Sequence, residues 1–131
     1  MSDPRFEAST PFTEEEISRI ERVLGRPLPA DYTAFVRAYG GVFVSGLVDG
    51  DAALALDGFD GADAILSSLS TLTDLRKDGI LPFATCVLGN RFVLDRHNAV
   101  HYINYYGGKT TTQRLAGTFG ELLPRIVVVD D

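Results

Sequence analysis

The spacing of apolar residues predicts that the chain begins with two helices. The first opens at Thr13 and Glu16, whose spacing is that of a capping box, in which each side chain binds the backbone N–H of the other residue. Its apolar positions recur every three or four residues, as on one buried helix face. They are Ile17, Ile20, Val23 and Leu24. Gly25 ends this helix, because glycine reaches positive φ without steric cost.

The second helical segment, residues 28–41, reads LPADYTAFVRAYGG. Pro29 suits the first helical position, where its missing N–H costs nothing. Large apolar residues follow at i, i+3, i+4 and i+7, which is one helix face. They are Tyr32, Phe35, Val36 and Tyr39. Gly40 and Gly41 end the helix, and we expect the stripe to be its packing face.

The pattern then changes to that of strands. Residues 42–48 and 52–56 predict a hairpin, because the Asp-Gly-Asp turn at 49–51 favours positive φ. Residues 57–61 form a loop, and residues 62–76 show mostly helical spacing, which predicts a middle helix.

The rest of the chain predicts an antiparallel meander and a short final helix. The predicted strands are residues 80–88, 91–95, 100–106 and 109–115, and the turns between them are Gly89-Asn90, His97-Asn98-Ala99 and Gly107-Gly108. Thr118 and Glu121 repeat the capping-box spacing, and Pro124 limits the helix that they open. Residues 127–129 add a last extended piece.

Together these elements predict one α+β domain. Two N-terminal helices pack on a mostly antiparallel sheet, with a middle helix and a short C-terminal helix. A length of 131 residues is usual for a single domain. Residues 1–12 contain two prolines and no periodicity, so we interpret them as an N-terminal arm and residues 13–131 as the domain. No apolar run approaches a membrane span and no signal-peptide pattern is present, so we expect a cytoplasmic protein without membrane contact.

Charge is unevenly distributed along the chain. The net charge of −6 argues against a nucleic-acid partner, because phosphate contacts need a basic face. Between Ala38 and Leu75 there is no Lys or Arg, but there are six aspartates. They are Asp49, Asp51, Asp57, Asp60, Asp63 and Asp74. Turns and helix caps explain some of them, but not Asp57 or Asp74. We predict that the six form the surface that binds a protein partner.

A tyrosine cluster offers a second candidate contact. In a strand, Tyr102 and Tyr106 share one face and Tyr105 takes the other. At least one of them should be half-exposed, and tyrosine is enriched at protein interfaces. We therefore add Tyr105 to the candidate partner-binding residues, while ordinary strand packing stays open as the alternative.

The motifs for catalysis or ligand binding are incomplete. Residues 108–110 read Gly-Lys-Thr, but Ile103 replaces the glycine that a phosphate-binding loop requires five positions earlier. His97 and His101 have the spacing of zinc ligands on a helix, but they lie in a predicted turn and strand. Cys86, which is the single cysteine, lies in an apolar strand and has no cation beside it in sequence to stabilise a thiolate. We expect neither an enzyme nor a metal or other cofactor.

Several motifs in order resemble the SUKH superfamily. The first is the Leu-Pro-x-Asp-Tyr-x-x-Phe-x-x-x-Tyr-Gly-Gly run of residues 28–41, which follows a helix ending in glycine. The others are Leu81-Pro82-Phe83-Ala84, Gly89-Asn90, Asp95, Val100, and Phe119 with Leu122-Leu123. The resemblance covers about residues 13–125. It departs at Asn90, where many relatives carry Asp, and over residues 42–78, which match no motif.

The resemblance implies a binding function. SUKH proteins include bacterial immunity proteins and a fungal cell-wall-assembly regulator. A member of the first kind would bind a cognate bacterial toxin and neutralise it by stoichiometric occlusion. The acidic segment suits a basic toxin such as a nuclease, because complementary charge speeds association. The alternative is a non-enzymatic regulatory adaptor that binds a host protein. Both readings leave the oligomeric state open.

Overall fold

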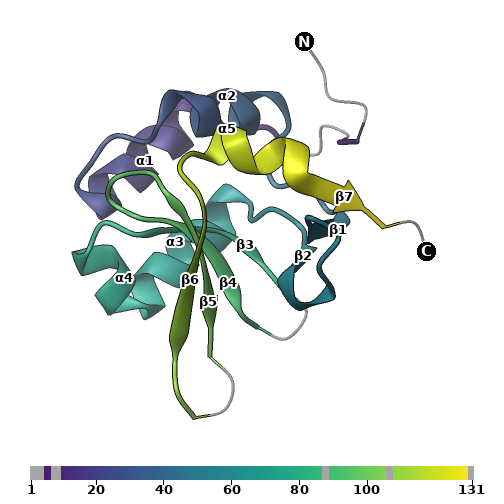
Figure 1. The fold of residues 1–131 in the computed structure, drawn as a ribbon. Helices are drawn as coiled ribbons and strands as arrows, with labels where there is room; N and C mark the ends of the chain where they lie inside the picture. The colour runs from purple at the N-terminus through teal and green to yellow at the C-terminus, as the bar shows by residue number, and fades with distance from the viewer. Residues whose placement is uncertain (1–4, 7–9, 87–88, 106–107, 130–131) are drawn as a thin grey trace.

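The computed structural model of the chain describes residues 5–6, 10–86, 89–105 and 108–129 (Figure 1). In this part of the chain the helices are α1 (Glu14–Leu24), α2 (Ala30–Ala38), α3 (Ala62–Thr71), α4 (Thr73–Lys77) and α5 (Phe119–Leu122), with 3-10 turns η1 (Ala52–Leu54) and η2 (Leu123–Arg125). The strands are β1 (Ser45–Val48), β2 (Ala55–Asp57), β3 (Leu81–Thr85), β4 (Arg91–Leu94), β5 (Val100–Asn104), β6 (Thr111–Ala116) and β7 (Ile126–Val128). The predicted α+β fold is confirmed. Tyr106, Gly107 and the end of the strand predicted over 80–88 lie outside the described residues.

The capping box of α1 forms as predicted. The Glu16 N–H donates to Thr13 Oγ1 at 3.1 Å, and the Thr13 N–H donates to Glu16 Oε1 at 2.9 Å. Gly25 follows the helix with φ of 75°. The prediction was wrong for Val23, which is 36% exposed and lies at the edge of the buried stripe.

The apolar stripe of α2 is also confirmed, since all four of its predicted residues are buried. Pro29 is the N-cap and not the first helical residue, so the predicted start was one position early. Gly40 has φ of 72° and forms a bridge with Thr10. A Cβ at Gly40 would lie only 1.9 Å from the backbone oxygen of Thr10. The glycine therefore serves both the helix end and the close approach of residue 10.

The strands form two antiparallel sheets (Figure 1). The order β3-β4-β5-β6 confirms the predicted meander. The second sheet has the order β2-β1-β7; its β1-β2 pair confirms the predicted hairpin, whereas the pairing of β7 with β1 was not predicted. A bridge between Phe59 and Ala84, with the Asp60 N–H donating to the Phe83 oxygen at 2.8 Å, connects the end of β2 to β3. The two sheets are therefore continuous through this bridge.

Three predicted elements differ from the structure between residues 52 and 76. The strand predicted at 52–56 begins as η1, because the Asp51 carboxylate accepts the Ala53 N–H at 2.9 Å and winds a 3-10 turn. Asp57 belongs to β2 and not to a loop. The middle helix is divided into α3 and α4 at Leu72, whose φ of −94° and ψ of 73° are not helical.

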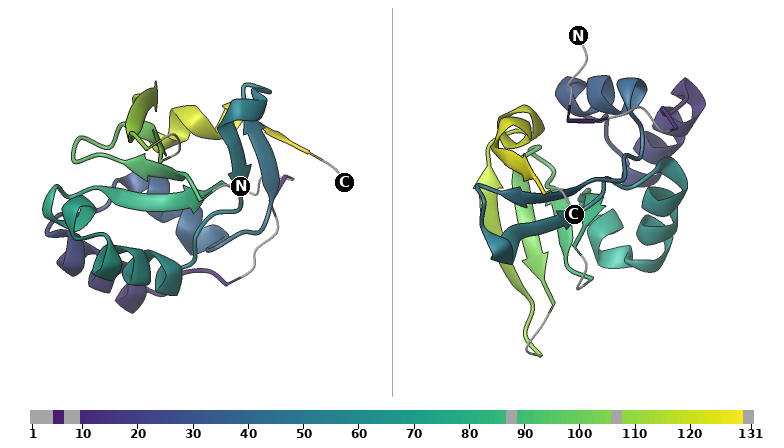
Figure 2. Two further views of the ribbon diagram at one scale, coloured as in Figure 1. Left: turned by 90° about the horizontal axis from the view of Figure 1, so that it is seen from below. Right: turned by 90° about the vertical axis from the view of Figure 1, so that its right-hand side faces the viewer.

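The helices α1 to α4 lie on one side of the strands (Figure 2). Between the helices and strands, Phe35 of α2 packs against an aromatic cluster that includes Phe6, Phe59 and Phe119. Arg5 donates from Nη1 to the Ile126 oxygen at 2.7 Å. Residues 5 and 6 are thus attached to the core and to β7, although they precede the domain boundary predicted at residue 13.

Tyr32→Phe is expected to raise the free energy of unfolding by about 1 kcal/mol. Tyr32 is fully buried, and its hydroxyl has no hydrogen-bond partner among the described residues. Burial, helped by the nearby negative charge of Asp60, raises the pKa of Tyr32 well above its usual range. A buried hydroxyl without a partner keeps its desolvation cost, so removing it should be favourable.

The measurement is urea denaturation followed by circular dichroism. Tyr102→Phe is the matched control, because the Tyr102 hydroxyl accepts from Asn90 Nδ2 at 2.9 Å. This variant should lose about 1–2 kcal/mol, since it leaves a buried amide donor unpaired. A Tyr32→Phe protein that is less stable than wild type would show that the Tyr32 hydroxyl has a partner.

Candidate partner-binding surface

The structure divides the six predicted aspartates among several elements. Asp49 and Asp51 lie together in the turn between β1 and η1, and Asp57 lies in β2. Asp63 lies in α3 and Asp74 in α4, and Figure 1 shows α4 on the left and the hairpin of β1 and β2 on the right. Asp49 and Asp51 are therefore neighbours, whereas Asp57 lies opposite Ser45 at the other end of the hairpin, and the whole set is not gathered at one place. That all six serve one partner surface stays a prediction.

Asp49 is tied to the C-terminal part of the fold. Its two carboxylate oxygens accept from Nε and Nη2 of Arg125 at 3.0 and 2.6 Å, and Nη1 of Arg125 binds the Leu115 oxygen. The hydrogen bond with Arg125 lowers the pKa of Asp49. The charge of Asp49 is therefore compensated within the chain. No ion pair among the described residues involves Asp51 or Asp57.

Asp60 is placed differently from the exposed aspartates. It is half-buried, and its Oδ1 accepts from Thr85 Oγ1 at 3.2 Å. Burial raises the pKa of Asp60, and the Thr85 hydrogen bond opposes that rise. Its carboxylate is thus partly occupied in joining the end of β2 to β3. Substitution of Asp60 would disturb packing as well as charge.

Asp74 and Tyr105 share one hollow, which we call the α4 groove. Its volume is about 450 Å³, and it lies between the α3–α4 junction and the ends of β5 and β6. Its apolar lining consists of Leu72, Leu75, Ile80 and Ile103. Tyr105 is 37% exposed, as predicted for one member of the tyrosine cluster, while Tyr102 is buried. The structure therefore brings together two predicted site residues that are far apart in sequence.

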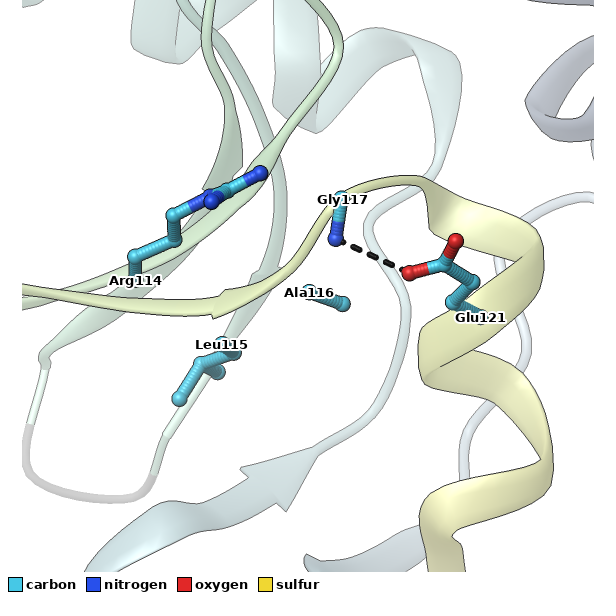
Figure 3. A pocket seen from close by; sticks show the side chains of 5 residues that line it. All are labelled: Arg114, Leu115, Ala116, Gly117 and Glu121. Carbon is cyan, nitrogen blue, oxygen red and sulfur yellow. Dashed lines mark hydrogen bonds between the residues drawn. The ribbon is translucent and has the colours of Figure 1, made fainter.

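A second hollow, of about 470 Å³, lies where β6 leads into α5 (Figure 3). Its lining consists of Arg114, Leu115, Ala116, Gly117 and Glu121. Glu121 Oε2 accepts the Gly117 N–H at 3.1 Å, and the Glu121 N–H donates to Thr118 Oγ1 at 3.1 Å. The second capping pair is thus present, except that Glu121 reaches Gly117 and not Thr118. The only carboxylate in this lining is already used to start the helix.

His97 lies in the turn before β5 and His101 lies in β5, and both contact Asp95. His101 Nε2 lies 2.7 Å from Asp95 Oδ2, and Asp95 Oδ1 accepts the N–H groups of His97 and Ala99 at 2.8 and 3.0 Å. Burial alone would raise the pKa of Asp95, but these hydrogen bonds together lower it. Among the described residues, no three metal-binding side chains come together.

Cys86 follows β3 directly and belongs to the core. Cys86 is buried, and its sulfur accepts from the Tyr102 hydroxyl at 3.6 Å.

No described helix has both the length and the apolar character needed to cross a bilayer.

An exposed apolar group on the β2-β1-β7 sheet was not predicted from the sequence. Phe43 is 86% exposed, whereas the other seven phenylalanines are buried. Val127 and Val129 are also exposed. A signal was present, because Val42 and Val44 are buried on one side of the strand and the alternation points Phe43 to the other.

Comparison with protein families gives one match. The family model described as SMI1 / KNR4 family (SUKH-1) matches residues 11–125. This range includes α1, α2 with its Leu-Pro-x-Asp-Tyr run, strands β1 to β6, and the segment over residues 42–78 that matched no motif. It confirms the resemblance seen in the sequence. None of the curated proteins compared with the chain matches it.

Proposed function

Because the chain belongs to the SMI1/KNR4 (SUKH-1) family, we propose that it is an immunity protein that binds a cognate bacterial toxin. The family match over residues 11–125 is the observation that carries this proposal. Inhibition is by stoichiometric occlusion of the toxin. The protein acts in the cytoplasm without catalysis, metal or other cofactor.

The toxin that we propose is basic, such as a nuclease. Support comes from the segment between Ala38 and Leu75, which has no Lys or Arg. Within it, Asp51 and Asp57 have no ion-pair partner among the described residues, so their charges are available to a second protein. Opposite charge on two surfaces speeds their encounter and disfavours wrong partners.

The test requires a basic toxin domain, which we expect to be encoded beside the gene, in a catalytically inactivated form. Calorimetry should give one immunity protein per toxin domain, and co-expression with the active toxin should restore growth. Absence of both binding and protection would contradict the proposal. If the purified protein instead binds a host protein and gives no protection, the adaptor reading would replace it.

Asp57→Lys is expected to slow association with the toxin domain markedly while leaving the fold intact. Asp57 is a half-exposed residue of β2, and its field is screened over about 10 Å at 0.1 M salt. Raising the salt concentration should therefore slow the wild type more than the variant. The measurement is the association rate as a function of ionic strength for both proteins.

Glu15→Lys is the matched control, because it makes the same charge change on an exposed part of α1 outside the acidic segment. It should change the rate much less than Asp57→Lys. Equal rates and parallel salt slopes for the wild type and Asp57→Lys would move the contact elsewhere, with the α4 groove around Tyr105 as the next candidate.

A further inference from the structure

The sheet β2-β1-β7 has an apolar face directed away from the core. Along β1 and the residues before it, Val42, Val44, Gly46 and Val48 are buried, so the alternate residues point outward. Register places Leu47 between Ala55 of β2 and Val127 of β7, and Ser45 opposite Asp57. We call this the outer face. It consists of Phe43, Ser45, Leu47, Ala55, Asp57, Val127 and Val129.

Exposure of large apolar side chains is concentrated on the outer face. Phe43 is 86% exposed, Val127 is 53% exposed and Val129 is 42% exposed. These are three of the five large apolar residues that are exposed in the described part of the chain. Scattered exposed apolar residues need no explanation, but a contiguous group on one sheet face marks an interaction site.

Phe43 lies beside Gly58. A Cβ at Gly58 would lie 3.8 Å from Phe43 Cδ2, so the phenyl ring lies beside the end of β2. Gly58 directly follows Asp57 in the chain, so the ring lies near the end of β2 that carries Asp57. An aromatic anchor with an acidic neighbour fits a partner surface that is apolar at its centre and basic at its rim.

Two other occupants fit the outer face less well. Pairing of a foreign strand along β7 is hindered, because Arg5 already binds the Ile126 oxygen on that strand. Stacking of a second copy would bring Asp57 and the Asp51 turn of two chains together, and the segment from Ala38 to Leu75 supplies no cation to offset them. Charge complementarity therefore favours a basic partner.

We propose that the outer face is the apolar centre of the toxin-binding surface, with Phe43 as its anchor in an apolar socket of the basic toxin. This inference rests on the proposed immunity function. Strands of three or four residues span only about 10 Å by 13 Å. A stable interface needs about 800 Å² on each partner, so neighbouring loops, including the turn with Asp51, contribute its rim. A few central aromatic residues commonly dominate such an interface.

The experiment measures the dissociation constant of the inactivated toxin domain for four proteins in 0.1 M salt. They are the wild type, Phe43→Ser, Val127→Ser and Val23→Ser. Phe43→Ser should weaken binding at least about 30-fold, as expected for an interface anchor. Val127→Ser should weaken it by a smaller factor. Val23→Ser is the matched control, because Val23 is an exposed apolar residue of α1 outside the outer face, and its binding should equal that of wild type.

Each other outcome has a definite meaning. If the wild type binds and Phe43→Ser binds equally well, the surface assignment is overturned while the immunity function stands. If the wild type does not bind the toxin domain, the proposed immunity function is wrong. The assignment of the toxin to the outer face is then wrong as well. Sedimentation of the wild type and Phe43→Ser tests the second copy: a wild-type dimer that Phe43→Ser dissociates would assign the outer face to self-association and overturn the proposal. Unchanged melting temperatures show that the variants remain folded.

Discussion

Phe35→Ala is expected to lower the free energy of unfolding by about 3–5 kcal/mol. The Phe35 ring lies 4.8 Å from the ring centroid of Phe59, 5.3 Å from that of Phe119 and 5.5 Å from that of Phe6. It therefore joins α2 to the N-terminal residues, to the segment after β2 and to α5. Truncation leaves a cavity that these separate segments cannot close together. Urea denaturation followed by circular dichroism gives the value.

Phe43→Ala is the matched control for this prediction. It removes the same atoms from a residue that is 86% exposed, so it should change stability by less than about 0.5 kcal/mol. The difference between the two variants isolates the effect of burial. A cost below about 1 kcal/mol for Phe35→Ala would contradict the assignment of Phe35 to the centre of the core.

Gly40→Ala is expected to cost about 2–5 kcal/mol, or to prevent soluble expression. The φ of 72° at Gly40 is in the left-handed region, where a residue with a Cβ loses about 1–2 kcal/mol. In addition, the Cβ would lie 1.9 Å from the Thr10 oxygen, so the backbone of residue 10 must move. Overpacking of this kind adds about 1–3 kcal/mol. Denaturant titration of the purified variant measures the sum.

Gly50→Ala separates the two contributions. Gly50 has φ of 73°, but no atom lies within 4 Å of the position that its Cβ would take. Its cost should therefore be the conformational part alone, about 1–2 kcal/mol. Equal losses for Gly40→Ala and Gly50→Ala would show that the contact with residue 10 gives way without cost.

The elements that could be predicted from the sequence are those fixed by neighbouring residues. The cap at Thr13 and Glu16 depends on groups three positions apart, and the stripe of α2 depends on residues within about two helical turns. The end of α2 is fixed in the same way by Gly40. Where a competing local interaction existed, the prediction was wrong: the Asp51 carboxylate binds Ala53 N–H and replaces the start of a strand with a 3-10 turn.

The addition of β7 to the hairpin of β1 and β2 could not be predicted, because this pair joins distant segments. Nothing near Val127 indicates that it lies opposite Leu47. Asp31 is a similar case. It belongs to the Leu-Pro-x-Asp-Tyr run, and its Oδ2 accepts the Gly120 N–H at 2.8 Å, which ties α2 to the first turn of α5. The sequence displays Asp31 as a motif residue without showing what it binds.

The residue types of the candidate surface could be predicted from the sequence, but the way in which those residues are arranged could not. The excess of aspartate was visible, but the pairing of Asp49 with Arg125 depends on residues 76 positions apart. That pairing decides which charges are left for a partner. The exposure of Phe43 was open to prediction from strand alternation, provided that one face of β1 was known to lack a covering layer.

The central position of β1 has a consequence for synthesis of the chain. Val128 pairs with Gly46 but is translated about 80 residues later. At about 5–20 residues per second, roughly 4–16 s separate the two events. During that interval the edge of β1 that receives β7 is open, and an open edge can recruit other chains. Any premature termination before residue 126 would therefore cause aggregation as well as loss of a strand.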